Sequence, residues 1–428
     1  MPARSQQAIE EAPRLQRGMS PRLTSWISEK GLSREFWIFF VAALCYDFGF
    51  AMFLFLYNLF LLDIGFNERQ LGFVVGAMTI GGVVGTIPIG LLAQRVGLRR
   101  VLLAGFVLTP LASALRTIVV GERAQIGLAF LTGLCICYWP VCFSPSAAKL
   151  TTEKNRTFAF SLLLSVGICV GGLGGLVGGC LPGWLQTINP SMQSADAKRV
   201  VLLLCCLIVA LGAWPISRLR LQVDGEKQSR SWRLDPFLFR FLPAVALWSL
   251  ASGSFAPFAT AYLSRHIHIP LAHIGMIFSA SQLAQVVAIL LAPTVFKRCG
   301  LVTGIMYTQV ATAIALAGLA RSHNVPLTVV LYLSFTAFHW MGGPGIYSLL
   351  MNRVPEGERS TASAANSLVT SLCQAIASAV SGAAYVDFGY PAVLMGIAVI
   401  ALLAALLFWA LLRDTHDSNA IAIAPVEC

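Results

Sequence analysis

The 428-residue sequence contains very little charge. Asp, Glu, Lys and Arg together make up 11% of it and hydrophobic residues 57%, whereas roughly 25% of an ordinary soluble protein is charged. So few charged side chains cannot cover a water-facing surface, which excludes a soluble globular protein. The 30 basic residues outnumber the 19 acidic ones, but they lie in short clusters between apolar runs and not in the continuous patch of a nucleic-acid-binding protein. The composition predicts an integral membrane protein that binds no nucleic acid.

The sequence also lacks the short motifs of common enzymes and metal sites. It contains no C-x-x-C pair, no Walker loop and no Ser-His-Asp spacing, and its 11 cysteines lie mostly inside apolar runs, as buried thiols of a reducing compartment would. His266, His268 and His273 fall in one loop, but no cysteine or carboxylate pair is near them in the sequence. We therefore expect no enzyme activity, no cofactor and no metal site.

Twelve apolar runs of about 20 residues are present, each long enough to cross a hydrocarbon core of about 30 Å. They are predicted to be helices, because lipid cannot hydrogen-bond an exposed backbone and the runs lack the alternation of barrel strands. The predicted fold is an all-α membrane protein with twelve transmembrane helices. Their ranges are 36–62, 71–93, 101–120, 125–149, 158–181, 200–219, 237–263, 272–293, 301–320, 326–351, 361–384 and 391–412.

The distribution of Lys and Arg predicts the orientation of the chain. If the N-terminus is cytoplasmic, most of the 30 basic residues lie in the tails and cytoplasmic loops, as membrane proteins prefer. Both termini are then cytoplasmic, and the lipid bilayer of the cytoplasmic membrane surrounds a chain that we expect to be monomeric. Arg116, near the outer end of its span, is expected to extend its charge to the membrane surface.

The two halves of the chain are related by an internal repeat with an offset of about 203 residues. The motifs R-x-G and E-x-x-R recur at that offset, which a biased composition alone does not explain. Six helices per half give the halves the same orientation, so they are parallel repeats. The matched pairs are Gly72 with Gly275, Arg95 with Arg298, Gly97 with Gly300, Glu153 with Glu356, Arg156 with Arg359, and Gly179 with Gly382. The predicted parts are a tail (1–35), a six-helix half (36–219), a linker (220–236), a second half (237–412) and a tail (413–428).

The loop after the second span resembles the signature of the major facilitator superfamily, G-x-x-x-D-R-x-G-R-R. From Gly90 to Arg100 the sequence reads G-L-L-A-Q-R-V-G-L-R-R, with Gln94 where the family has an acidic residue. Further similarity lies in the segment 65–68 before the second span and in Gly389-Tyr390 before the last. The resemblance implies a transporter with an inner gate in its cytoplasmic loops, where intra-half ion pairs should join Arg99 or Arg100 to Glu153, and Lys297 or Arg298 to Glu356 or Glu358. The gate residues are Gly90, Gln94, Arg95, Gly97, Arg99, Arg100, Glu153, Arg156, Lys297, Arg298, Gly300, Glu356 and Arg359.

Asp47 is the most informative single residue, because it lies in the middle of the first apolar run. A charged side chain at the centre of a membrane helix costs roughly 2.5 to 3.5 kcal/mol on insertion scales, so such residues usually face a wet cavity or a partner. In the resembled fold the first helix lines the central cavity. Asp47 is thus either a group that takes up a proton or a cation, or a structural hydrogen-bonding group between helices.

Other polar and aromatic residues also fall near the middle of their spans, on helices that line the cavity of the resembled fold. Prolines and glycines beside some of them weaken the backbone hydrogen bonds at the depth where transporters bind their substrates. Each residue can line a cavity or fill space between helices, and we expect most to converge on one pocket for an organic cation or a neutral solute. They are Tyr138, Trp139, Trp248, Gln282, Gln285, His339 and Trp340.

These features predict a secondary active transporter for a small organic solute, working by alternating access and coupled to protons. The alternative is a protein with a transporter fold that acts as a membrane sensor or binds a partner without transport. A sensor would be expected to carry a soluble signalling domain. The longest predicted cytoplasmic segment, 1–35, is short for such a domain, which argues against the alternative.

Overall fold

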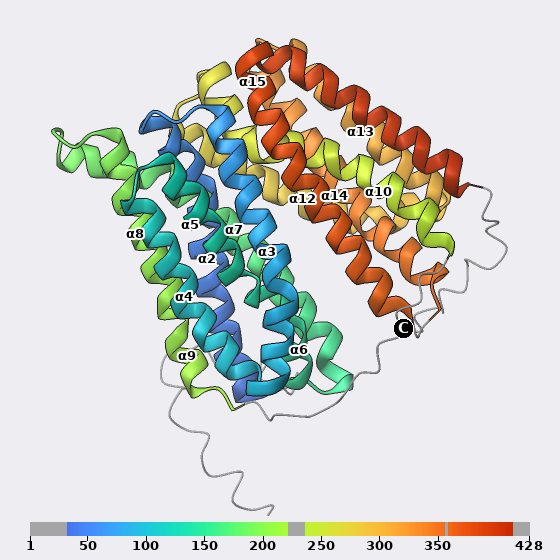
Figure 1. The fold of residues 1–428 in the computed structure, drawn as a ribbon, viewed down its shortest axis with the longest axis horizontal. Helices are drawn as coiled ribbons and strands as arrows, with labels where there is room; N and C mark the ends of the chain where they lie inside the picture. Colours follow the sequence, from blue (N-terminus) through green and yellow to red (C-terminus); the bar gives the residue numbers. More distant parts are fainter. Residues whose placement is uncertain (1–31, 221–235, 356–357, 414–428) are drawn as a thin grey trace, which may run out of the picture.

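The computed structural model describes residues 32–220, 236–355 and 358–413, and every regular element within these ranges is a helix (Figure 1). The first half contains α2 (Arg34–Asp63), α3 (Glu68–Val96), α4 (Leu98–Ile118), α5 (Glu122–Ile136), α6 (Tyr138–Lys149), α7 (Glu153–Ile188), α8 (Ser194–Leu211) and α9 (Ala213–Arg218). The second half contains α10 (Pro236–Phe255), a 3-10 turn (Ala256–Phe258), α11 (Ala259–Ala261), a π turn (Tyr262–His266), α12 (Leu271–Cys299), α13 (Leu301–Arg321), α14 (Val325–Arg353) and α15 (Arg359–Leu412).

Eleven helical stretches in the described part of the chain are long and apolar enough to cross a membrane. The count is eleven and not twelve because α15 contains both of the last two predicted spans. At Gly389 the backbone of α15 is not helical (φ 75°, ψ 167°), a conformation that glycine adopts without steric cost. Figure 1 draws α15 as two rods that meet at an angle, so the twelve predicted spans are all present as helix.

Three predicted spans are interrupted near a proline. The seventh contains the 3-10 turn Ala256–Phe258, which includes Pro257, and the other two are each divided at a single residue. The fourth span is divided at Cys137 between α5 and α6, and the sixth at Gly212 between α8 and α9. Pro140 and Pro215 each follow their break by three residues. A proline has no N–H to donate to the carbonyl four residues earlier and its ring clashes there, so the helix breaks on its N-terminal side.

Local sequence explains the start of α3 and the ends of α3 and α12. The side chain of Asn67 accepts from the N–H of Gln70, and the side chain of Gln70 accepts from the N–H of Asn67, both at 3.0 Å, so α3 begins with a capping box. At the far ends of α3 and α12 the glycines of the repeated R-x-G motif, Gly97 and Gly300, have φ of 93° and 81°. The repeat therefore specifies the same helix stop in both halves.

The two halves form two helical bundles that lie side by side (Figure 1). They touch mainly along two seams, where α3 packs against α15 and α7 packs against α12, and α2 also contacts the short α11. The extra residues between the fifth and sixth predicted spans of the first half are largely helical, because α7 extends to Ile188 and α8 begins at Ser194.

Candidate functional site

Glycine pairs bring the two halves into backbone contact at both seams. A Cβ added at Gly72 of α3 would overlap the carbonyl oxygen of Ser378 in α15, and one at Gly382 would overlap the carbonyl of Glu68. At the other seam, a Cβ at Gly179 of α7 would lie 2.9 Å from the Cα of Gly275 in α12. Since the repeat maps Gly72 onto Gly275 and Gly179 onto Gly382, the two contacts are copies of one another.

The contacts between the halves are concentrated at one end of the molecule, which we call the closed end. It carries the loop 64–67, the loop 267–270 and the turn at Gly389. Toward the opposite end, called the open end, the two bundles diverge in Figure 1. In the first half, the contacts that cross to the second half involve residues 55–76 and 171–179.

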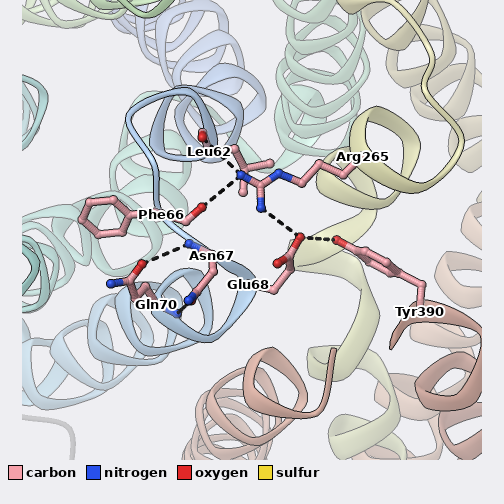
Figure 2. Close-up of polar contacts among 7 residues, drawn as sticks. All are labelled: Leu62, Phe66, Asn67, Glu68, Gln70, Arg265 and Tyr390. Carbon is pink, nitrogen blue, oxygen red and sulfur yellow. Dashed lines mark hydrogen bonds and ion pairs between the residues drawn. The ribbon is translucent and has the colours of Figure 1, made fainter. Parts of the chain in front are cut away.

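A polar cluster joins the halves at the closed end (Figure 2). The guanidinium of Arg265 donates to Glu68 Oε1 (3.4 Å) and to the carbonyl oxygens of Leu62 and Phe66 (both 3.2 Å). The hydroxyl of Tyr390 donates to the same oxygen of Glu68 at 3.1 Å. We call Glu68, Arg265 and Tyr390 the closed-end cluster. Only 8% of Glu68 is exposed, so its charge depends on these two donors.

A second ion pair lies beside the cluster. Arg69 Nη2 is 2.8 and 3.0 Å from the two carboxylate oxygens of Asp387. Both side chains are about half exposed. It joins the same two helices, α3 and α15.

The irregular end of the seventh span positions Arg265. After α10 the chain forms the 3-10 turn and then the π turn that carries Arg265. These turns free carbonyl oxygens, and two of them are capped from other helices: Asn58 Nδ2 donates to Pro257 O (2.8 Å) and the Tyr385 hydroxyl donates to Ser254 O (3.0 Å). The sequence alone does not indicate the closed-end cluster, although Glu68 and Tyr390 lie in the two segments that resemble the family.

Asp47 lies half-buried in the middle of α2 and faces the glycine-rich surface of α7. A Cβ at Gly167 would be 2.6 Å from Asp47 Oδ2. The described residues supply no hydrogen bond or ion pair to this carboxylate. One turn further along α7, a Cβ at Gly171 would be 3.6 Å from the side-chain nitrogen of Gln282. Because residues four apart share a helix face, Asp47 and Gln282 flank one strip of bare backbone on α7.

The aromatic candidates of the first half pack against one another. Trp139 stacks on Tyr46, with ring centroids 4.3 Å apart, and is partly exposed. Tyr138 is 1% exposed, and its ring lies where a Cβ of Gly105 in α4 would have to fit. Tyr138 therefore points into the helix bundle of the first half.

The candidates of the second half lie in different surroundings. His339 stacks on Trp248 at 5.3 Å, and its Nε2 is 3.2 Å from the hydroxyl of Ser252. Trp340 is 50% exposed, on a different face of α14 from His339. Gln285 is partly buried, about one turn from Gln282. The structure thus brings Trp248 together with His339, and Asp47 and Gln282 to the same strip of α7. Tyr138 and Trp139 pack against Tyr46, the neighbour of Asp47 in the chain.

Comparison with known proteins places this arrangement in a family. The family model described as Major Facilitator Superfamily matches residues 39–249 and 241–424. The chain belongs to this superfamily. No curated protein sequence matches the chain. Its transporter neighbours among solved structures share the fold at low sequence identity.

The nucleoside transporter NupG is 14% identical, with a TM-score of 0.76 over 89% of this chain and 100% of that one. The xylose transporter XylE from E. coli, in an inward open conformation, is 16% identical, with a TM-score of 0.68 over 90% and 97%. A bacterial homologue of the iron transporter ferroportin, in an inward-facing state, is 17% identical, with a TM-score of 0.66 over 88% and 98%. The chain is therefore a multi-pass membrane protein with a superfamily transporter fold.

The superfamily signature lies at the open end. Arg99 donates to the carbonyl oxygen of Ser217, which ties the start of α4 to α9. The guanidinium of Arg359 donates to Val354 O at 3.3 Å. The side chain of Glu153 and all of Glu356 lie outside the described residues, so the ion pairs expected of them stay predictions. Other signature residues have exposed side chains: Gln94, Arg95, Arg100, Arg156, Lys297 and Arg298.

Proposed function

We propose that the protein is a secondary active transporter that carries a small organic solute across the cytoplasmic membrane by alternating access, coupled to protons through Asp47. The observation that carries the proposal is the unpartnered carboxylate of Asp47 in the middle of a membrane helix. A carboxylate without a partner at that depth favours proton or cation uptake. The absence of a hydrogen bond to Asp47 within the described residues argues against the purely structural role.

The contact geometry supports alternating access. The halves touch at one end and diverge at the other (Figure 1), and alternating access requires a region between the halves that is reached from one side of the membrane at a time. Exchange between this arrangement and its opposite would expose the region to the other side. Superfamily membership and the inward-facing forms of XylE and the ferroportin homologue support an assignment of the open end to the cytoplasm.

The polar and aromatic residues predicted near the middle of their spans favour an organic cation or a neutral solute over a dianion. Gln282 and Gln285 offer amide donors and acceptors without charge, and Trp139 and Trp340 offer partly exposed rings. Asp47 supplies the one carboxylate. NupG and XylE are named for a nucleoside and a sugar, which are neutral hydroxylated solutes of the proposed kind.

Flux measurements test this proposal. Purified protein in liposomes is given a pH gradient and a panel of nucleosides, pentoses, quaternary amines and dicarboxylates. We expect accumulation of at least one neutral or cationic solute that collapses when an ionophore removes the gradient. A sensor with a transporter fold would bind a solute without moving it. Binding without flux for every bound solute would therefore overturn the transporter assignment.

Orientation and oligomeric state complete the proposal. The basic loops predict cytoplasmic termini, and we propose a monomer. A fluorescent protein fused after Cys428 should fold and fluoresce in the cytoplasm, whereas a protease outside the cell should reach the closed-end loop 189–193. A fusion that does not fluoresce, together with a loop that the external protease does not cut, would contradict this orientation.

A further inference from the structure

The two seams between the halves are symmetric in their glycine packing but not in their charge. Along residues 171–188 of α7 the sequence contains no Asp, Glu, Lys or Arg. The α7–α12 seam has a neutral hydrogen bond, from the Ser279 hydroxyl to the Gly172 carbonyl at 2.5 Å. The α3–α15 seam, in contrast, has the closed-end cluster beside it and the Arg69–Asp387 pair across it.

The internal repeat does not duplicate these charges. At the offset of 203 residues, Glu68 corresponds to Leu271 and Arg69 to Ala272. In the other direction, Arg265 corresponds to Leu62 and Asp387 to Trp184. The four charged residues of the ionic contacts therefore correspond to apolar residues at the related positions. The four glycines of the seams, in contrast, correspond to glycines.

We propose that the closed end is locked from one seam only, the α3–α15 seam, and that the closed-end cluster is the lock. Glu68 lies on α3, Tyr390 on α15, and Arg265 on the π turn between them (Figure 2). The α7–α12 seam is closed by packing and a neutral hydrogen bond. The balance between the closed and open forms of this end is then set by three side chains on one side of the molecule.

Burial identifies Glu68 as the central residue of the lock. Its side chain is 11% exposed and both donors converge on one carboxylate oxygen. Separating α3 from α15 strands this charge before water can reach it fully, which is unfavourable. The Arg69–Asp387 pair is about half exposed, and ion pairs of that kind contribute little to stability.

Hydrogen exchange of the full-length protein in nanodiscs tests the lock without a transported ligand. Peptides covering 68–76 and 375–390 report on the locked seam, and peptides covering 171–179 and 271–279 on the other. For Glu68→Gln we expect exchange at the locked seam to rise about tenfold, because the acceptor of Arg265 and Tyr390 loses its charge and hydrogen bonds to a charged group are about twice as strong as neutral ones. We expect a clearly smaller rise at the α7–α12 seam. Tyr390→Phe, which removes one donor, should give a smaller rise with the same pattern.

The control is Asp196→Asn, which breaks the Arg199–Asp196 pair (3.0 Å) at the same end but inside the first half. It should leave exchange at both seams unchanged. Unchanged exchange in both Glu68→Gln and Tyr390→Phe would overturn the lock, and an equal rise at the two seams would overturn its one-sidedness. If Glu68→Gln fails to fold, Tyr390→Phe alone decides between these outcomes. The lock does not depend on the proposed transport activity, so this test stands or fails separately from the flux assay.

Discussion

Gln125 is a fully buried amide that connects three elements of the first half. It accepts a hydrogen bond from the hydroxyl of Tyr57 in α2 and lies in α5. Its nitrogen donates to the carbonyl oxygens of Arg116 (2.5 Å) and Val119, at the end of α4. These carbonyls have no partner in the next helical turn, so one side chain caps α4 and attaches it to α2.

Gln125→Leu should therefore destabilise the protein strongly. The change removes the partner of three buried polar groups, and each unsatisfied group costs about 1 to 3 kcal/mol. We expect the apparent melting temperature of the purified protein to fall by several degrees. Gln193→Leu is the matched control, because the side chain of Gln193 is exposed and does not cap its helix. Equal melting temperatures for the two variants would contradict the capping role.

Asp47→Asn should separate proton coupling from solute movement. The amide keeps the shape and the hydrogen-bonding capacity of the carboxylate beside Gly167 but cannot take up a proton. We expect loss of gradient-driven accumulation with exchange of labelled solute across the membrane largely retained. Asp196→Asn should accumulate solute as the unmodified protein does. Full pH-driven accumulation by Asp47→Asn would refute the coupling role.

Contacts of single residues were hard to predict from the sequence. The expectation that Arg116 extends to the membrane surface was wrong: it is 2% exposed and its guanidinium lies 4.3 Å from the centre of the Tyr57 ring. Tyr57 is 59 positions away in the chain, so no local pattern indicates this cation–π contact. Arg265 and Glu68 went unselected for the same reason, because their importance comes from each other.

At the scale of helices, the glycines of the seams determine how closely the halves approach. Gly382→Ala should push α15 away from α3, because the new methyl group would overlap the carbonyl of Glu68. We expect a fall of several degrees in the apparent melting temperature. Gly396→Ala in the same helix is the control: nothing lies within 4 Å of its added Cβ, and alanine is favoured over glycine in helices by up to about 1 kcal/mol. Destabilisation by Gly396→Ala alone would contradict the prediction.

Helices were predicted well where apolar length was the only information needed. The twelve runs and the repeat identified the elements, and the parallel halves followed from the even number of helices per half. The turns within spans were harder to predict, because an apolar run shows that a segment crosses the membrane but not whether its backbone is regular. The seventh span was predicted as one helix, and the turns that place Arg265 have carbonyl oxygens bonded by Asn58 of α2 and Tyr385 of α15, contacts that no local pattern in the sequence shows.

At the scale of the whole molecule, the two halves are alike in fold and unlike in the charge at their contact. A repeat keeps what both seams need, which is close backbone approach, and leaves the remaining positions free to diverge. The result is a pseudo-symmetric protein with asymmetric chemistry at its closed end. That end has polar contacts of very different exposure, from the buried Glu68 to the half-exposed Arg69 and Asp387.

The exposed Arg69–Asp387 pair makes the molecule sensitive to the solution on one side of the membrane. Dissolved ions screen charges over about 10 Å at 0.1 M and about 3 Å at 1 M, but they reach this pair only from the closed end. In oriented liposomes, 1 M potassium chloride on that side, osmotically balanced by sucrose on the other, should raise hydrogen exchange in 375–390 about twofold. The reversed salt gradient should leave hydrogen exchange in 375–390 unchanged. An equal rise for both directions of the gradient would contradict this prediction. A difference in ionic strength across the membrane would thus act on the protein as a difference in conformational free energy.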